Sequence, residues 1–214
     1  MNFYEANYEF IQMKELFKGD PEWEKALALF HCLTLRDRAT AEHSIEVGYY
    51  AARVAEKLNL DTSRYFLAGL VHDIGKINMN DHPLKTCDVL SKRERNVLKG
   101  HVLHGVLTLS ELGFGEDIVQ FCSRHHERLN GSGYPFGIED KNTSIEGRIA
   151  QVTDVFSALT SKRKYRENHK SHSCKEALEL MKEEAKEKGT LDHNIINILE
   201  IIVTEGFDGQ RQYA

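Results

Sequence analysis

The chain has 214 residues, of which 41% are apolar and 29% are charged, a composition typical of a folded globular protein and not of a disordered one. Its cysteines, Cys32, Cys87, Cys122 and Cys174, are widely spaced, which argues against a disulfide framework and a zinc ribbon and favours a reducing compartment. The net charge of -5 gives no overall attraction for a polyanion, so we expect no DNA binding.

The N-terminus, MNFYEANYEF, lacks the basic and apolar regions of a secretory signal, and no stretch approaches the roughly 20 apolar residues of a membrane span. We therefore expect a cytoplasmic protein without a membrane segment. Only three prolines interrupt the chain, and alternating strand patterns are scarce, so we predict an all-α domain. Residues 1–38 contain the amphipathic segment WEKALALF and are interpreted as a short helical N-terminal extension without site chemistry.

The first helix of the main domain is expected to be capped by Thr40 and carries apolar residues at helical spacing as far as Leu58. His43 lies four residues before Val47, on the same inward face. A second helix is expected from about Ser63.

This second helix meets His72 and Asp73, and Gly75 is placed to end it. Ser91 and Glu94 form a capping box that opens a helix predicted to run through His101 to Leu112. His101 would then lie at its middle, on one face with Val97 and Leu98.

The next helix is expected from Glu116, with His125 and His126 in its last turns, before the glycine-rich stretch NGSGYPFG at 130–137. Residues 145–159 return to helical spacing and carry Asp154 beside their apolar face. Ser173 with Glu176 forms a second capping box, ahead of two final helices.

Seven polar side chains lie on or at the ends of these helices, on or beside an apolar face: His43, His72, Asp73, His101, His125, His126 and Asp154. A buried imidazole or carboxylate is costly to desolvate unless it is paired or binds a metal, so seven of them predict a shared partner. A single histidine of this kind is more often a satisfied core residue, by roughly three to one. The pairs His72–Asp73 and His125–His126 favour metal ligands over core residues, because both pairs lie at helix ends. Such a set suits transition metal ions, with Asp73 bridging two of them.

Three blocks in this order resemble the HD-GYP family of HD-domain metal-dependent phosphohydrolases: HDIGK at 72–76, HHERLNGSGYPFG at 125–137 and RIAQVTDVFSALTSKRKYR at 148–166. HSIEV at 43–47 and HVLHG at 101–105 extend the match over about residues 40–202. The resemblance implies an HD-domain-like helical bundle at 39–205, followed by a tail at 206–214.

The resemblance further implies hydrolysis of cyclic di-GMP to pGpG and GMP, with a metal-bridging hydroxide as nucleophile. By position it assigns metal ligation to the seven side chains above, and it implies two divalent ions, iron or manganese first and zinc, nickel or cobalt otherwise. Asp73 and Lys76 would be catalytic. The side chains expected to face the substrate are Lys76, Tyr134, Arg163 and Arg166.

Three positions depart from the family's pattern. Ala39 stands where members with three metals carry a glutamate, which favours two ions here. Asn130 replaces the usual aspartate, and Lys164 replaces the usual proline. Two alternatives stay open: a non-catalytic module that binds a cyclic dinucleotide or docks a cyclase-domain protein, and a phosphodiesterase for another cyclic dinucleotide such as cyclic GMP-AMP. Two interpretations of residues 1–38 also stay open: a homodimer interface and the remnant of a linker.

Overall fold

The computed structural model describes residues 3–85, 89–161 and 171–211, and these are helical apart from loops and one isolated bridge between Asn130 and Glu139. The all-α prediction is confirmed. In chain order the helices are α1 (Phe3–Leu16), α2 (Pro21–Arg36), α3 (Arg38–Lys57), α4 (Thr62–Val71), the 3-10 helix η1 (Ile74–Asn78), α5 (Asp81–Lys85), α6 (Lys92–Lys99), α7 (His101–Glu111), α8 (Glu116–Arg124), the 3-10 helix η2 (Asp140–Asn142), α9 (Ile145–Thr160), α10 (Cys174–Lys188) and α11 (His193–Arg211). Within the described part of the chain, no helix has both the length and the apolar character that crossing a membrane requires.

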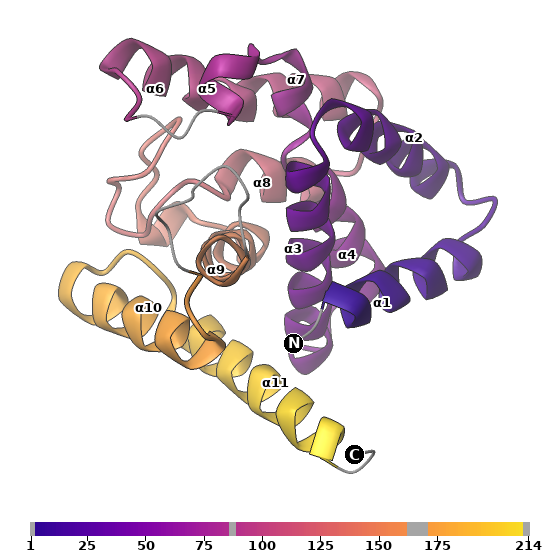
Figure 1. Ribbon diagram of the computed structural model, residues 1–214. Helices are drawn as coiled ribbons and strands as arrows, with labels where there is room; N and C mark the ends of the chain where they lie inside the picture. Colours follow the sequence, from indigo (N-terminus) through magenta and orange to yellow (C-terminus); the bar gives the residue numbers. More distant parts are fainter. Residues whose placement is uncertain (1–2, 86–88, 162–170, 212–214) are drawn as a thin grey trace.

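Helices α3 and α4 pack against each other at the centre of the molecule (Figure 1). Helices α1 and α2 flank them on one side, and α8 and α9 lie on the other, while α10 and α11 run along the lower edge and contact α9 and α3. Helix α7 packs on η1 and α8, close to the end of α4. The ends of α4, α6 and α8 and the middle of α9 therefore face a common region beside α3.

The amphipathic segment in α2 packs into the same apolar core as the central helices. Trp23, Leu27 and Phe30 are buried there, and the Trp23 ring lies 6.1 Å from the ring of Phe66 on α4, measured between centroids. Burial of large apolar side chains is the main stabilising contribution of such a helix. The domain boundary at residue 38 stays a prediction.

Two glycines allow the close crossing of α3 and α4. A Cβ atom on Gly69 would lie 2.5 Å from the Cα atom of Gly48, so a larger residue would push the helices apart. The crossing holds the His43 and His72 rings with their centroids 5.4 Å apart.

Two predicted helix ends are wrong. Helix α3 begins at Arg38, and Asp37 caps it, because the Asp37 carboxylate accepts hydrogen bonds from the Thr40 backbone N–H at 3.2 Å and the Thr40 hydroxyl at 2.5 Å. Helix α4 ends at Val71 with His72 as its C-cap, and Gly75 lies within η1 instead of ending α4.

The helix predicted over 91–112 is two helices. The capping box of Ser91 and Glu94 is confirmed, but α6 ends at Lys99 and α7 begins at His101, so His101 is not at the middle of a helix. Val97 is 49% exposed and does not share the buried face of His101.

Helix α8 likewise ends two residues earlier than the sequence suggests. Its last residue is Arg124, so His125 is its C-cap and His126 belongs to the following turn. Periodicity could not locate either break, because the residues on both sides of each break keep a helical pattern.

Candidate metal centre

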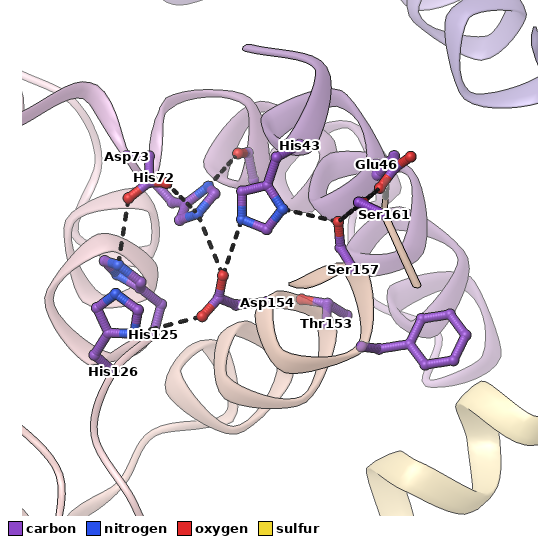
Figure 2. Close-up of polar contacts among 12 residues, drawn as sticks. His43, Glu46, His72, Asp73, His125, His126, Thr153, Asp154, Ser157 and Ser161 are labelled. Atoms are coloured by element: carbon purple, nitrogen blue, oxygen red, sulfur yellow. Dashed lines mark hydrogen bonds and ion pairs between the residues drawn. The ribbon is translucent and has the colours of Figure 1, made fainter. Parts of the chain in front are cut away.

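The seven polar side chains singled out in the sequence meet at one place beside α3. Figure 2 labels all of them except His101. They come from five helices or their ends, and six of them are buried: His43, His72, Asp73, His101, His125 and Asp154. The His126 side chain is 22% exposed, so the cluster is open to solvent on its side. Their role as metal ligands stays a prediction, but the geometry brings all of them together.

Three of the imidazoles are held in the same way, each at the end of a helix. His72 Nδ1 lies 2.7 Å from Gly69 O, His101 Nδ1 lies 2.5 Å from Leu98 O, and His125 Nδ1 lies 2.6 Å from Cys122 O. Each acceptor is the carbonyl three residues earlier, in a last helical turn where carbonyls lack helical partners. A carbonyl only accepts, so Nδ1 carries the proton in each ring and Nε2 is left with a lone pair.

The lone pairs of two of these rings face each other. His101 Nε2 and His125 Nε2 lie 3.2 Å apart, although both rings already donate through Nδ1. Among the described residues, His72 Nε2 and Asp73 Oδ1 are buried polar atoms without a hydrogen-bond partner. Buried acceptors that face each other are unfavourable unless a cation lies between them. The residues present therefore fit a metal ion.

Both carboxylates lie between two groups of imidazoles. Asp73 Oδ1 is 3.3 Å from His101 Nε2, while Asp73 Oδ2 is 3.5 Å from His72 Nε2. Asp154 shows the same relation, since its Oδ1 is 3.0 Å from His43 Nε2 and its Oδ2 is 3.4 Å from His126 Nδ1. The sequence predicted this geometry for Asp73 but not for Asp154.

Three groups of donor atoms are compact enough to hold an ion, with all atoms of a group within 4.8 Å of one another: His43, His72 and Asp154; His101, His125 and His126; and His72, Asp73 and His125. The first two groups share no residue, and the third lies between them. The arrangement can therefore accommodate two neighbouring ions.

The charge states of these groups suit cation binding. Burial lowers the pKa of His126 to about 3, and burial together with the neighbouring histidines holds the pKa of His125 well below its ordinary value, so both are neutral donors near pH 7. Burial by itself raises the pKa of Asp73, but Lys76, His72 and His101 together outweigh it and hold that pKa well below its usual range. Asp154 has a lowered pKa too, because its contacts with His43, His126 and His125 together outweigh the effect of burial.

Two of the predicted substrate contacts lie next to this cluster. Lys76 Nζ donates to Asp73 Oδ2 at 2.5 Å, and its side chain is 14% exposed. The Tyr134 ring lies 4.7 Å from the His126 ring, and burial raises the pKa of its hydroxyl. Tyr134 packs on a cluster residue and is not the exposed aromatic of its loop, which is Phe136 at 55% exposure. Arg163 and Arg166 lie outside the described residues.

One residue beside the cluster that the sequence patterns did not single out is Glu127, next to the two histidines. It is fully buried, and its carboxylate accepts hydrogen bonds from the backbone N–H groups of Phe136 at 2.6 Å and Ile138 at 3.0 Å. The carboxylate thus ties the two ends of the loop that carries Tyr134. Its position directly after His126 was the feature of the sequence that could have identified it.

Ser157 and Glu46 were missed as well. Ser157 Oγ lies 2.8 Å from His43 Nδ1 and donates to Glu46 Oε2 at 2.7 Å, as Figure 2 shows. Each lies three residues after a cluster residue on its own helix, and this spacing was the signal that could have found them.

The asparagine at position 130 takes a structural role. Asn130 Nδ2 donates to Lys188 O at 2.8 Å, and Asn130 Oδ1 accepts from the Ser132 N–H at 3.1 Å. The first bond joins the loop to the end of α10, and an aspartate could not supply it; the second lies within the loop.

The histidines left out of the predicted site do not join the cluster. His31, His82, His104, His172 and His193 are exposed, and His169 lies outside the described residues. The five imidazoles of the cluster are therefore a selected subset, not a general accumulation of histidine.

Comparison with known proteins places this geometry in context. A family model described as HD domain matches residues 27–195. The 3'3'-cGAMP-specific phosphodiesterase 1 of Vibrio cholerae is 32% identical over 178 residues, which cover 81% of this chain and 40% of the relative. The cyclic di-GMP phosphodiesterase of Thermotoga maritima is 36% identical over 140 residues, which cover 61% of this chain and 37% of the relative. The chain thus spans less than half the length of these two relatives.

A solved structure shares the fold. The HD domain of the L. monocytogenes phosphodiesterase PgpH superposes with a TM-score of 0.62 at 16% identity, and the match covers 86% of this chain and 98% of that domain. At this identity the likeness concerns the helical architecture alone.

Proposed function

The chain belongs to the HD-domain family, and on that premise we propose that it is a metal-dependent phosphodiesterase that hydrolyses cyclic di-GMP to pGpG and in turn to GMP. The observation that carries the proposal is the meeting of five imidazoles and two carboxylates from five helices, with ring nitrogens that face one another instead of donors. Such a cluster costs stability in a protein that does not use it, because each polar group must be desolvated.

We propose that the seven side chains hold two divalent ions, iron or manganese first and zinc, nickel or cobalt otherwise. Imidazole-rich sites suit these metals, whereas magnesium and calcium prefer oxygen ligands. Ala39 supplies no carboxylate on the turn of α3 before His43, which supports two ions and not three. The chemistry that such ions supply in hydrolases is neutralisation of phosphate charge and a lower pKa of water.

The protein's own residues would orient and polarise the phosphodiester. Lys76 holds Asp73 in place and has access to solvent, so its ammonium group can also donate to a phosphate oxygen as negative charge builds. The raised pKa of Tyr134 keeps its hydroxyl protonated near pH 7, so it can act as a donor to the substrate. Arg163 and Arg166 are proposed to contact the second phosphate or a guanine, as the family resemblance implies.

Cyclic GMP-AMP is the second candidate substrate, and one observation favours it. The Vibrio cholerae relative that covers 81% of this chain is named as specific for 3'3'-cGAMP. Both substrates carry the same phosphodiester linkage, so the metal cluster does not distinguish between them. Contacts to the purine bases would decide the preference.

The remaining predictions about the protein's surroundings stay predictions: cytoplasmic location, a cyclase-domain partner and a homodimer through residues 1–38.

The non-catalytic alternative is a domain that binds a cyclic dinucleotide without cleaving it. It differs from the enzyme in one measurable property, since it needs no metal. Metal content therefore separates the two hypotheses before any activity is assayed.

The test uses protein purified without oxygen and reconstituted with ferrous iron or manganese. We expect about two metal ions per chain and linearisation of cyclic di-GMP, cyclic GMP-AMP or both, followed by chromatography of the products. His72→Ala and Asp73→Ala should abolish turnover. His104→Ala is the matched control, because His104 is exposed one turn after His101.

Two results would overturn the proposal. Turnover that survives complete chelation would exclude metal dependence. Less than one metal per chain after reconstitution, together with retained nucleotide binding, would favour the non-catalytic module.

A further inference from the structure

His43 is held differently from the other anchored imidazoles of the cluster. His72, His101 and His125 donate to carbonyls at helix ends, whereas His43 lies within α3, where the carbonyls of the preceding turn accept the helix's own bonds. Its Nδ1 instead faces the hydroxyl of Ser157 on α9 at 2.8 Å. A side chain more than 100 positions away in the sequence thus replaces the local carbonyl.

The direction of the hydrogen bonds sets the state of the His43 ring. Ser157 Oγ donates its single proton to Glu46 Oε2 at 2.7 Å, since a carboxylate accepts and does not donate. The hydroxyl must then accept from His43, which puts the ring proton on Nδ1 and leaves Nε2 facing Asp154 Oδ1 at 3.0 Å. His43 therefore presents the same nitrogen to the cluster as the three imidazoles held by carbonyls.

The four residues of this arrangement come from two helices, two residues from each, as Figure 2 shows. On α3, Glu46 lies three residues after His43, and on α9, Ser157 lies three residues after Asp154. Residues three apart share a helix face, so the cluster pair and the supporting pair meet across the α3–α9 contact. Ser161, one turn further along, also donates to Glu46 Oε2 and holds the carboxylate in place.

We propose that Ser157 and Glu46 are positioning residues that fix the tautomer and orientation of His43 for metal binding. This inference rests on the proposed metal centre and extends it to two residues that no comparison assigns. Without the Ser157 hydroxyl, the His43 ring loses the hydrogen bond from Nδ1 to Ser157 Oγ. Without the Glu46 carboxylate, the Ser157 hydroxyl is released to donate to Nδ1, which would place the ring proton on Nε2.

The experiment measures the affinity of both metal ions by titration of the metal-free protein with manganese or zinc against a competing chelator. Loss of a residue that orients a metal ligand typically lowers affinity about 10- to 100-fold. We expect Ser157→Ala to weaken one of the two ions by this factor and to leave the other near its wild-type value. We expect Glu46→Ala to weaken the same ion by a smaller factor.

Conservative variants separate positioning from a general loss of structure. Glu46→Gln keeps an amide oxygen that accepts the Ser157 proton, so affinity should be close to that of the wild type. Glu42→Ala is the matched control, because Glu42 lies on α3 and pairs with the exposed Arg38 at 2.8 Å. Thermal unfolding of each metal-free variant checks that the fold is retained, and Glu46→Ala carries the test if Ser157→Ala does not fold.

Unchanged affinity for both ions in Ser157→Ala and Glu46→Ala would overturn this inference while leaving the metal centre intact. Equal weakening of both ions, with a lower unfolding temperature, would also overturn it, because that pattern indicates loosened packing. A wild-type protein that binds no metal would instead remove the proposed function, and the positioning role with it.

Discussion

Gly75 lies so close to His101 that a Cβ atom on Gly75 would be 1.9 Å from the His101 carbonyl oxygen. The same Cβ atom would be 2.6 Å from the Gly105 nitrogen, so both contacts are with the backbone of α7 and cannot be relieved by a side-chain rotation. This contact between η1 and α7 sets the separation of Asp73 from His101.

Gly75→Ala should therefore move α7 and the His101 ring. Overpacking of this kind costs about 1–3 kcal/mol, and we expect the upper end because backbone must shift. Urea unfolding measures the loss, and metal titration should show weaker binding. Gly113→Ala is the control, since Gly113 has open space and a φ of +70°, so only about 1 kcal/mol of backbone strain is expected. Equal losses in the two variants would contradict the close contact as the cause.

Metal binding should stabilise the folded chain. An ion at 100 times its dissociation constant adds about 2.7 kcal/mol for each site that forms only in the folded state. We expect manganese or zinc to raise the unfolding temperature of the wild type and of His104→Ala, and to have a reduced effect on His101→Ala. A rise of the same size in His101→Ala would show that the ions bind elsewhere.

The stability of the metal-free protein should fall as the pH is lowered from about 7. The pKa of His126 is about 3 in the folded protein, against 6.5 for an unperturbed histidine, and the pKa of His125 is lowered too. The unfolded chain therefore binds protons below pH 6.5 that the folded chain does not accept. Each group removes about 1.4 kcal/mol of stability per pH unit in that window.

Urea unfolding at pH 7.5 and pH 5.5 tests this prediction, with His126→Gln as the informative variant. Glutamine does not titrate, so the slope of the variant's unfolding free energy against pH should correspond to the uptake of about one proton fewer on unfolding than in the wild type. The lowered pKa values of Asp73 and Asp154 act in a separate window, because their stabilising effect is lost only as the pH falls below about 3.8. Equal pH dependence of wild type and variant would contradict the assignment to His126.

Glu127→Gln should loosen the loop that carries Tyr134. The backbone N–H groups of Phe136 and Ile138 each donate to one oxygen of the Glu127 carboxylate. A glutamine has only one acceptor oxygen, so its NH2 group would face one of these two donors. A buried donor left unsatisfied costs about 1–3 kcal/mol. We expect a raised KM with a smaller change in kcat, and faster proteolysis within 128–139. Glu139→Gln, on an exposed residue of the same loop, should leave KM unchanged.

Asn130→Asp tests whether the departure from the family's aspartate is structural. The variant loses the amide donor to Lys188 O and brings a carboxylate oxygen toward that carbonyl. We expect a loss of about 1 kcal/mol in the free energy of unfolding, measured by urea, with metal affinity unchanged. A more stable variant would mean that the bond to Lys188 does not hold the loop.

Much of the site could be predicted from the sequence because its residues occur in short local motifs. The pairs His72–Asp73 and His125–His126 are recognisable as adjacent polar residues at predicted helix ends. The capping boxes at Ser91 and Ser173 mark helix starts through hydrogen bonds between residues only three positions apart. The helix breaks were harder to place. Gly100 separates α6 from α7 within a continuous helical pattern, and the cap of α3 is Asp37 and not Thr40.

The sequence by itself determined the all-α class and the identity of the seven polar residues, because helical periodicity and the desolvation cost of imidazoles and carboxylates are local properties. Only the tertiary structure decided that Asp154 lies between two imidazole groups, that Ser157 and Glu46 support His43, and that Gly75 must lack a side chain. These relationships join residues on different helices. They depend on how closely and at what rotation two helices pack, and local patterns do not encode those quantities.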